Sequence, residues 1–232
     1  MNKKRKFKPR DRKKDTFTSI EDWIPKTKLG KDVMEGKVTS MEQIFEEGKN
    51  ILESEIVDFI LPGLEHEIIL IGGSPGKGGG KRRTPSKRTA RMHKSGRRFN
   101  TTCLVVAGNK DGYVGIGIGK APEFQNAMKK ALNKAKINII PIKRGCGSWE
   151  CGCGENHSIP FEVRGKEGSS MVILKPAPKG LGLCVSDSVK KLMILTGIKD
   201  LWIKSSGKTK TRTNYIKAVF NALKELNTIK TG

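Results

Sequence analysis

The sequence lacks any long hydrophobic run. None of its 232 residues lies in a stretch approaching the ~20 apolar residues that a membrane-spanning helix needs. The N-terminal stretch MNKKRKFKPRDRKK carries the charges of a secretory signal but has no apolar run or cleavage site behind them. We therefore expect a cytoplasmic protein without a membrane partner.

Aromatic and acidic residues are both scarce. Phe, Trp and Tyr make up 6% of the chain, which disfavours a binding surface built mainly on stacking with single-stranded bases. Lys and Arg number 46 against 23 Asp and Glu, so the formal net charge is +23. Such an excess favours a polyanionic partner that is held through its phosphates.

Cysteine is infrequent too, but three of the five cysteines stand together in the stretch CGSWECGCGENH. An odd count grouped in this way resembles ligand placement more than a disulfide framework. Cys146, Cys151, Cys153 and His157 have the spacing C-x4-C-x-C-x3-H, and the glycines among them allow a tight loop to surround a tetrahedral zinc ion. The pattern therefore predicts a structural zinc site that staples the junction of two domains and has no catalytic role.

Other interpretations of this loop stay open. Because C-x-C is rarer than C-x-x-C at structural zinc sites, the residues could instead be reduced thiols, a redox-sensitive loop or ligands of an iron cluster. The two remaining cysteines, Cys103 within an expected strand and Cys184 before an expected helix, are interpreted as small buried hydrophobes.

The net charge of the N-terminal third of the chain changes from positive to negative along the sequence. Residues 1–20 are expected to form a disordered basic tail, because nine Lys or Arg lie between positions 3 and 14. Residues 21–71 are expected to form an acidic helical extension, since nine acids face only two lysines between positions 35 and 67. That acidic surface should avoid phosphate and be either solvated or a dock for a basic protein.

Two helices are expected within the acidic extension. Thr39 and Glu42 have the spacing of a capping box, and Gly48 would end the helix that they begin. A second helix from Glu53 to Leu61 would place Ile56, Phe59 and Ile60 on one face, before Pro62 and Gly63 stop it.

A basic, glycine-rich segment follows. Residues 72–98 contain ten Lys or Arg, seven glycines and no acid, so they have too little apolar content to form a core. We expect a mobile basic loop over residues 72–90 that lies on nucleic acid, rather than a plain linker. The candidate RNA-contacting residues in this basic stretch are Lys81, Arg82, Arg83, Lys87, Arg88 and Arg91.

Residues 91–157 are expected to hold a hairpin and a helix. Asn109 and the Asp111-Gly112 pair supply turn chemistry between two apolar runs. In the second run the glycines at 115, 117 and 119 leave one face bare, so that a helix can approach closely. Phe124, Met128, Ala131, Leu132 and Ala135 then recur at helical spacing, and the lysines among them fall largely on the other faces.

Residues 158–232 repeat the order of strands followed by a helix. IPFEV, MVILKPAP and IKDLWIK are expected strands, Ser186 or Asp187 is expected to cap one helix, and Thr211 or Thr213 to begin the last one. Strands followed by a helix, twice, predict an α+β fold rather than one wound parallel sheet.

Catalytic motifs are incomplete in this chain. GGSPG matches a nucleophile elbow, but the residues after Ser74 cannot form the required helix. GIGIGKA and GGSPGKG fall short of the Walker spacing, and His157 is not followed by the Glu and the Pro-Cys-x-x-Cys of a zinc deaminase. We therefore predict that the protein is not an enzyme.

From Arg91 onward the chain resembles the universal small-subunit ribosomal protein S5 family, called S2 in eukaryotes. The stretches that carry the resemblance are RMHKSGRR, LVVAGNKDGYVGIGIGKAPE, HSIPFEVRGKEGSS, LKPAPKGLGL, TGIKDLW and NYIKAVFNALKEL. RGCGSWECGCGENHSIP is similar to the archaeal form specifically, and WIPKTKLGKDVMEGKVTSMEQIF resembles the N-terminal extension of the archaeal and eukaryotic branch. Residues 72–90 are longer and more basic than in many relatives, so their path along RNA cannot be transferred.

The resemblance implies a double-stranded-RNA-binding-like N-terminal domain followed by an S5 C-terminal domain. It implies a place in the small ribosomal subunit, contacts with ribosomal RNA and with ribosomal proteins S4 and S8, and a position near the channel through which messenger RNA enters. No homo-oligomer is expected. The resemblance also suggests RNA contacts at residues that match the family's motif positions. These are Lys94, Arg97, Arg98, Lys120, Lys166, Lys175 and Lys179.

Three functions compete at this point. A structural ribosomal protein, supporting subunit assembly and decoding accuracy, should bind RNA by shape and phosphate with strong salt dependence. A free double-stranded-RNA-binding module acting off the ribosome should bind any duplex. A zinc-dependent nucleic-acid enzyme would need an open metal position beside an acid such as Glu150 or Glu155, whereas four protein ligands would close the site.

Overall fold

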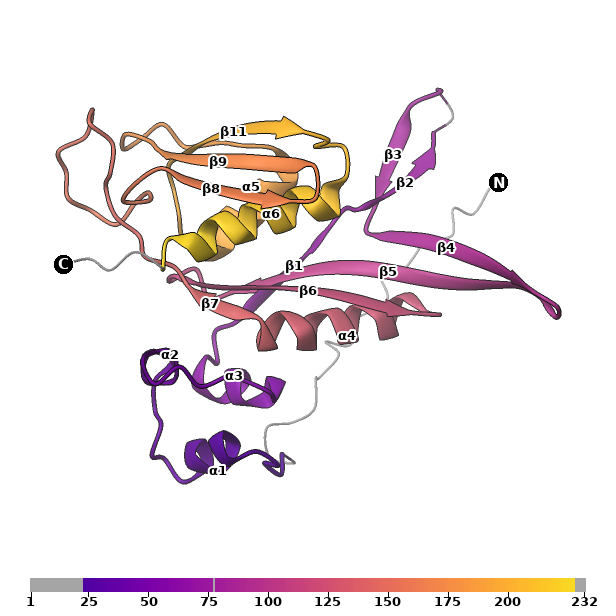
Figure 1. Ribbon diagram of the computed structural model, residues 1–232, viewed down its shortest axis with the longest axis horizontal. Coiled ribbons are helices and arrows are strands. Elements are labelled where there is room, and N and C mark those ends of the chain that lie inside the picture. Colours follow the sequence, from indigo (N-terminus) through magenta and orange to yellow (C-terminus); the bar gives the residue numbers. More distant parts are fainter. Residues whose placement is uncertain (1–22, 77, 228–232) are drawn as a thin grey trace, which may run out of the picture.

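The computed structural model describes residues 23–76 and 78–227, so the expected basic tail over residues 1–20 lies outside the described part. Three parts follow one another along the chain: a small group of helices, a first sheet that carries one long helix, and a second sheet with two helices (Figure 1). The fold as a whole is of mixed α+β type, as predicted. Among the described residues, no helix is both long and apolar enough to cross a membrane.

The helical unit at the N-terminal end consists of α1 (Lys28–Met34), α2 (Met41–Glu46) and α3 (Ser54–Ile60). Thr27 is the N-cap of α1, and its hydroxyl oxygen accepts a hydrogen bond from the Gly30 amide. The predicted capping box is wrong by one residue, because Ser40 is the N-cap of α2 and Gln43, rather than Glu42, bonds back to the Thr39 amide at 3.1 Å. The helix α1 itself was not expected.

Apolar side chains from all three helices form the core of the helical unit, together with Ile139 beyond it. Ile56 and Val57 of α3 are fully buried there. Phe59 is 48% exposed, so the expected apolar face of this helix is wrong at that position. The reason is that Val57, next to Ile56, packs into the core of the helical unit, so the buried face of α3 is rotated away from Phe59.

The first sheet has the order β1-β5-β6-β7, and β4 pairs with the free part of β5. Its strands are β1 (Glu65–Ile69), β4 (Ser86–His93), β5 (Gly96–Gly108), β6 (Tyr113–Ala121) and β7 (Ile139–Pro141). The predicted hairpin is the β5–β6 pair. Its turn is held by the Asn109 side chain, which accepts hydrogen bonds from the amides of Asp111 and Tyr113.

The helix α4 (Phe124–Ile137) lies directly on the glycines of β6. A Cβ placed on Gly115, Gly117 or Gly119 would stand only 1.9 to 2.0 Å from a backbone carbonyl oxygen of α4. The expected close approach of a helix to this face is therefore confirmed.

The segment over residues 72–90 is not a loop, which corrects the expectation from its composition. Residues 72–75 (β2) and 81–84 (β3) form an antiparallel hairpin, and most of the remainder belongs to β4. Pairing between backbone amides and carbonyls needs no hydrophobic core, so Gly and Arg can occupy such strands. The β4–β5 hairpin, residues 86–103, extends far beyond the body of the molecule and is called the basic ribbon below (Figure 1).

The second sheet has the order β10-β11-β9-β8 and belongs to the C-terminal domain. Its elements are β8 (Val163–Glu167), β9 (Ser170–Pro176), β10 (Leu183–Cys184), α5 (Asp187–Thr196), β11 (Leu201–Gly207) and α6 (Arg212–Glu225). The stretch IPFEV was expected as a strand, but regular pairing begins only at its last residue, Val163. The N-caps of α5 and α6 are Ser186 and Thr211.

One continuous core joins the two sheets. Leu104, Val106, Val114 and Ile116 of the first sheet pack in the same cluster as the buried side chains of α5 and α6. The opposite face of that sheet packs on α4. The first sheet is thus covered on both faces, and the two domains hold each other through buried apolar area.

Candidate metal centre and nucleic-acid surface

The four candidate metal ligands lie in one loop between β7 and β8. Residues 145–158, called the cysteine loop, close on themselves through paired hydrogen bonds between Gly145 and Ser158. Next to this closure, a Cβ on Gly147 would stand 1.9 Å from the Pro160 carbonyl oxygen, so only glycine fits there. The short loop, closed at both ends, can therefore hold its three thiols close together in space.

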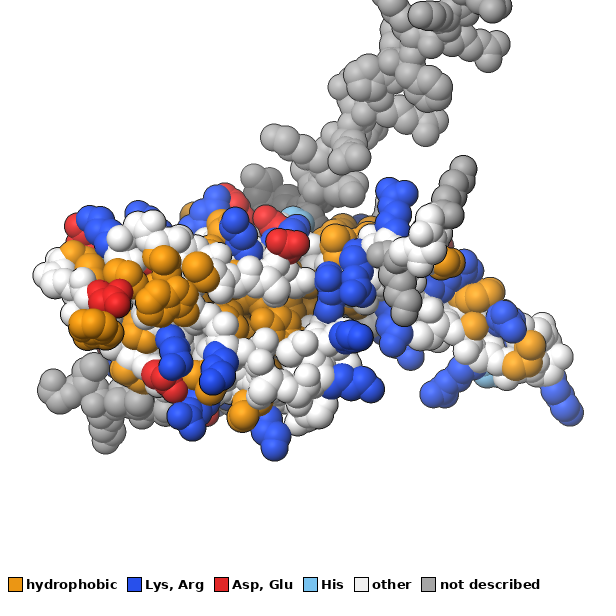
Figure 2. Space-filling model, turned by 90° about the horizontal axis from the view of Figure 1, so that it is seen from above, with side chains coloured by type: hydrophobic (Ala, Val, Ile, Leu, Met, Phe, Trp, Pro, Cys, Tyr) orange, Lys and Arg blue, Asp and Glu red, His pale blue; other side chains and the backbone are white. Residues whose placement is uncertain are grey.

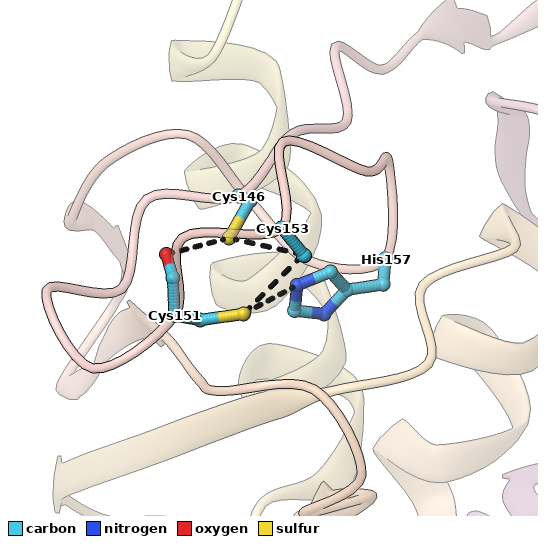
Figure 3. Close-up of side chains that lie close together, drawn as sticks. All are labelled: Cys146, Cys151, Cys153 and His157. Atoms are coloured by element: carbon cyan, nitrogen blue, oxygen red, sulfur yellow. Dashed lines mark hydrogen bonds between the residues drawn. The ribbon is translucent and has the colours of Figure 1, made fainter.

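Figure 3 shows Cys146, Cys151, Cys153 and His157 turned toward one another. The Cys153 sulfur lies 3.3 Å from that of Cys151 and 3.6 Å from that of Cys146. His157 approaches Cys151 through Nε2, at 3.8 Å. One ligand atom from each of the four residues lies within 4.8 Å of all the others, so the structure brings together the whole predicted set.

These separations fit a four-coordinate zinc ion. Zinc–sulfur and zinc–nitrogen bonds of about 2.3 and 2.0 Å place tetrahedral ligand atoms roughly 3.6 to 3.8 Å apart. The three shortest contacts, of 3.3 to 3.8 Å, agree with that range, and all ligand atoms lie within 4.8 Å of one another. All five cysteines are free thiols. Three sulfurs and one imidazole nitrogen are also the donor set of a closed structural site.

The histidine is held from behind by a carboxylate. His157 Nδ1 lies 2.9 Å from Asp200 Oδ2, and both side chains are almost completely buried. The other Asp200 oxygen accepts the Gly182 amide at 2.7 Å. A carboxylate at this position favours the proton of the neutral ring on Nδ1, which leaves Nε2 as the nitrogen that faces the thiols, the arrangement that metal-binding histidines require.

Further hydrogen bonds attach the cysteine loop to the C-terminal domain. Ser158 Oγ donates to the Asp200 carbonyl at 2.6 Å and accepts the Ala177 amide at 3.2 Å. The amides of Lys199 and Asp200 both donate to the His157 carbonyl. The loop is thus anchored beside β10 and β11, within the C-terminal domain.

Backbone amides surround the most acidic of the thiols. The N–H groups of Lys179 and Cys153 point at the Cys151 sulfur and lower the pKa of this thiol from 9.0 to about 6. The Glu155 amide lowers the pKa of Cys153, but the hydrogen bond with Cys151 and burial outweigh it, so the pKa of Cys153 is raised.

The two cysteines outside the loop differ from each other. Cys103 is fully buried among the side chains under α4, as predicted. Cys184 is exposed, so its interpretation as a buried hydrophobe is wrong. Cys184 lies in β10, a strand of two residues at the sheet's edge, where one face has no cover.

The predicted RNA-contacting residues fall into two groups. Most lie in β3 and along the basic ribbon, where the side chains of Arg82, Arg83, Lys87, Arg88, Arg91, Lys94, Arg97 and Arg98 are exposed. Lys81 belongs to β3 as well. Figure 2 shows Lys and Arg gathered over this end of the molecule. Within the described ranges, none of these eight exposed side chains has an acidic partner within 4.0 Å.

The second group lies on the body. Lys120 and Lys166 are exposed at the end of β6 and in β8. Lys175 and Lys179 instead form ion pairs with Glu162 and Glu155, at 3.4 and 2.7 Å. The structure therefore leaves the ribbon cations free for an outside anion, whereas part of the charge of Lys175 and Lys179 is already neutralised.

Three kinds of residue that bear on these sites were not predicted from the sequence. Asp200 is 43 positions from the histidine that it orients, and no spacing rule points to it. Lys136 has the spacing of a surface lysine, yet it is buried and bonds to Asp58 at 2.5 Å. Lys210 and Arg212 could have been found from the basic run KTKTR at 208–212, which lies close to β3 in the fold.

Comparisons with known proteins match most of the chain. The family described as "Ribosomal protein S5, N-terminal domain" matches residues 85–143, and "Ribosomal protein S5, C-terminal domain" matches residues 165–231. Two proteins named small ribosomal subunit protein uS5, from Staphylothermus marinus and Nanoarchaeum equitans, are each 48% identical to it, over 91% and 92% of both chains. The protein of that name from Methanothermobacter thermautotrophicus is 47% identical over 91% of both chains.

Proposed function

The chain belongs to the ribosomal protein S5 family, and from this premise we propose that it is a structural component of the small ribosomal subunit that holds ribosomal RNA by its sugar-phosphate exterior. It is not an enzyme, since the family consists of structural ribosomal proteins. Its similarity to archaeal relatives along nearly the whole chain places it in the archaeal type.

One observation carries the RNA-binding part of this proposal. The basic ribbon and β3 present eight exposed Lys and Arg side chains that have no acidic partner among the described residues, on strands that extend away from the body. The Arg88 guanidinium lies 3.8 Å from the centroid of the Phe99 ring, so a cation–π contact holds this cation on the surface of the ribbon. Such a surface neutralises phosphates and reads the shape of folded RNA rather than its base edges.

The finer contacts follow from the family rather than from the geometry of this chain. The proposed protein neighbours are ribosomal proteins S4 and S8, and the proposed location is beside the channel through which messenger RNA enters, where the protein would support assembly and decoding accuracy. The acidic helical unit suits this scheme, because its carboxylates repel phosphate and can face a basic protein.

Sedimentation of a cell extract tests the proposal. The protein should travel with small subunits in a sucrose gradient and be released from RNA as salt is raised. A variant with Arg91, Arg97 and Arg98 replaced by Gln should assemble poorly into subunits, because three ribbon cations are lost. A matched variant with Lys129, Lys130 and Lys190 replaced by Gln loses the same charge elsewhere.

The outcomes separate the two nucleic-acid functions. A free double-stranded-RNA-binding module would remain at the top of the gradient and bind any duplex with similar affinity. Equal loss of assembly in the ribbon variant and in its matched control would show that net charge alone, and not the ribbon, holds the RNA.

We also propose that the cysteine loop holds one structural zinc ion. Four ligand atoms within 4.8 Å of one another, a histidine oriented toward the thiols by Asp200 and a pinned backbone support this assignment. Four protein ligands leave no open position for substrate, so the ion would stiffen the loop rather than catalyse a reaction.

Elemental analysis tests the zinc proposal. The wild-type protein should contain about one zinc per chain, and the Cys146→Ser and Cys153→Ser variants should lose most of it. Cys184→Ser is the matched control, since this exposed cysteine lies outside the cluster and its loss should leave the zinc content unchanged. Wild-type protein without stoichiometric zinc would overturn the assignment.

A further inference from the structure

Two adjoining clefts lie where the β2–β3 hairpin meets the beginning of α6. One, of about 630 Å³, is lined by residues of β2, of β3 and of the start of β4 on one side and by residues 210–213 on the other. The second, of about 410 Å³, lies between Arg83 and the residues around the starts of α5 and α6, with Ser205 of β11. Lys210 and Arg212 line both, so the two clefts form one trough between the two domains.

Positive charge dominates this trough. Arg83, Lys87, Arg88, Lys210 and Arg212 line it, and Asp187 is the single acidic residue among the lining residues of both clefts. The first domain contributes three of these cations and the C-terminal domain contributes two. Cations from separate domains that converge on one hollow repel one another unless an anion lies between them.

Arg212 illustrates that repulsion. Its guanidinium donates to the Leu70 carbonyl at 3.0 Å, which fixes the side chain at the edge of the first sheet. Burial lowers the pKa of Arg212, and the nearby Arg83 cation lowers it further, while Asp187 only partly compensates. The arginine is therefore held in an unfavourable electrostatic position by packing and by a backbone hydrogen bond.

Hydroxyl groups complete the lining. Ser74, Ser86, Thr211 and Thr213 face the larger cleft, and Ser188, Ser205 and Thr209 face the smaller one. Guanidinium, ammonium and hydroxyl groups are the donors that phosphate oxygens accept from most often in RNA complexes. The trough contains few apolar side chains and so does not resemble a site for a hydrophobic ligand.

We propose that this trough binds a phosphodiester segment of structured RNA, with Arg83 and Lys210 contacting phosphates from opposite walls and Arg212 at the base. The inference rests on the proposed RNA-binding function. It extends the proposed contact surface from the base of the basic ribbon and β3, which supply Arg83, Lys87 and Arg88, to Lys210 and Arg212 of the C-terminal domain. RNA in the trough would span both domains and fix the β2–β3 hairpin against the C-terminal domain.

Salt-dependent binding to small-subunit ribosomal RNA tests this site. The Arg83→Gln/Lys210→Gln variant removes one cation from each wall and leaves Arg212 with its contact to Leu70. Each phosphate contact contributes about 0.9 to the magnitude of the slope of log affinity against log salt concentration. Loss of two contacts should therefore reduce that magnitude by about 1.8. The affinity at moderate salt should fall at least tenfold.

Two matched variants control for charge and folding. Lys190→Gln/Lys224→Gln removes two exposed lysines of α5 and α6 outside the trough and should change the slope by less than half as much. Arg83→Lys/Lys210→Arg keeps both charges and should bind nearly as well as the wild type. Thermal unfolding of each variant should match that of the wild type, because the two substituted side chains are exposed.

The outcomes distinguish this inference from the proposed function. If the wild type binds the RNA and the Arg83/Lys210 variant behaves like the Lys190/Lys224 control, the trough site is wrong while the RNA-binding function stands. If the wild type binds ribosomal RNA no better than an unrelated duplex, the proposed function fails instead. If the Arg83→Gln/Lys210→Gln variant bound RNA like the wild type but lost an acidic protein that the wild type retains, the trough would belong to that protein partner instead.

Discussion

Asp200 connects the candidate metal ligands to the fold at the scale of single residues. Its two carboxylate oxygens accept from His157 Nδ1 and from the Gly182 amide, and its backbone carbonyl accepts from Ser158. One side chain thus fixes the tautomer of a ligand and the position of the chain before β10. Partners of this kind strengthen metal binding because the ligand needs no reorientation.

Replacing Asp200 by Asn tests this role. The Asn oxygen can still accept from Gly182, but its amide would then donate to His157 Nδ1 and move the ring proton to Nε2. The ligand nitrogen would face the thiols with a proton on it, so we expect zinc affinity to fall about 10- to 100-fold. Competition with a chromophoric chelator measures this affinity.

The exposed Asp187→Asn substitution is the control, because it removes the same charge at a distance from the ligands. Equal affinities of the Asp200→Asn protein and the wild type would show that the carboxylate has a purely structural role. A fall in thermal stability without any change in affinity would lead to the same conclusion.

Glu53 holds the beginning of the helical unit in a similar way. Its carboxylate accepts hydrogen bonds from the amides of Lys26 and Thr27, at 2.9 and 2.7 Å, and from the Trp23 indole at 2.9 Å. Burial raises the pKa of Glu53, but these donors outweigh it, so the pKa is lowered from 4.5. The charged form is therefore the one that the folded helical unit stabilises.

Acid should loosen the helical unit. Because the folded pKa of Glu53 is below 4.5, its contribution to stability is complete above pH 4.5 and is lost as the pH falls through the folded pKa. Trp23 fluorescence should change over that range in the wild type and not in Trp23→Phe. The Glu53→Gln variant should already show the loosened signal at neutral pH, with local opening about tenfold more frequent; an unchanged signal would contradict the assignment.

At the scale of elements, contact between α4 and β6 depends on the absence of side chains. The carbonyl oxygens of Ala127, Ala131 and Ala135 lie directly over the three glycines of the strand. A helix this close to a sheet shields the backbone of both and allows small side chains to pack without voids.

The Gly117→Ala substitution should therefore be strongly destabilising. The added methyl would stand 1.9 Å from the Ala131 carbonyl oxygen and 2.4 Å from the Ala135 amide nitrogen, and backbone atoms cannot swing away. We expect a loss of about 1–3 kcal/mol or more in the free energy of unfolding, measured with urea. Gly63→Ala is the matched control, since nothing lies within 4 Å of its Cβ and its stability should be almost unchanged.

Elements encoded by neighbouring residues could be predicted from the sequence. The turn at Asn109 and the glycine alternation of β6 each depend on residues within a few positions, and both are found. The β2–β3 hairpin could not be predicted because its strands have neither apolar alternation nor a packed face, the two signals that distinguish strands from loops. The start of α2 moved by one residue because Thr39 and Ser40 compete for the same capping role.

The candidate sites show the same division. Three cysteines and a histidine within twelve residues indicate a ligand set, whereas Asp200 becomes its partner only when β11 is placed beside the loop. Lys136 resembles any surface lysine of α4 until α3 brings Asp58 against it, 78 positions away. Contacts between distant segments depend on tertiary packing, which local periodicity does not encode.

At the scale of the whole molecule, we expect folding not to depend on the cysteine loop. The largest cluster joins the first sheet to α5 and α6, and a second cluster lies between that sheet and α4. Of the buried side chains in these clusters, only Ile159 comes from the immediate neighbourhood of the loop. Cores of this size stabilise a chain of 232 residues without help from a metal ion.

Removal of zinc should consequently produce a local rather than a global change. After treatment of the zinc-loaded protein with a chelator, we expect amide hydrogen exchange to accelerate within residues 145–158 and at Asp200, whose amide donates to the His157 carbonyl. It should also accelerate at Gly182, whose amide donates to the Asp200 carboxylate. Exchange in β5, β6 and α4 should stay slow, and far-UV circular dichroism should hardly change. Because the proposed zinc ligands come from one segment, the ion would constrain that segment and little else. Collapse of the whole protein upon chelation would mean that the loop, and not the apolar contact between the sheets, holds the two domains together.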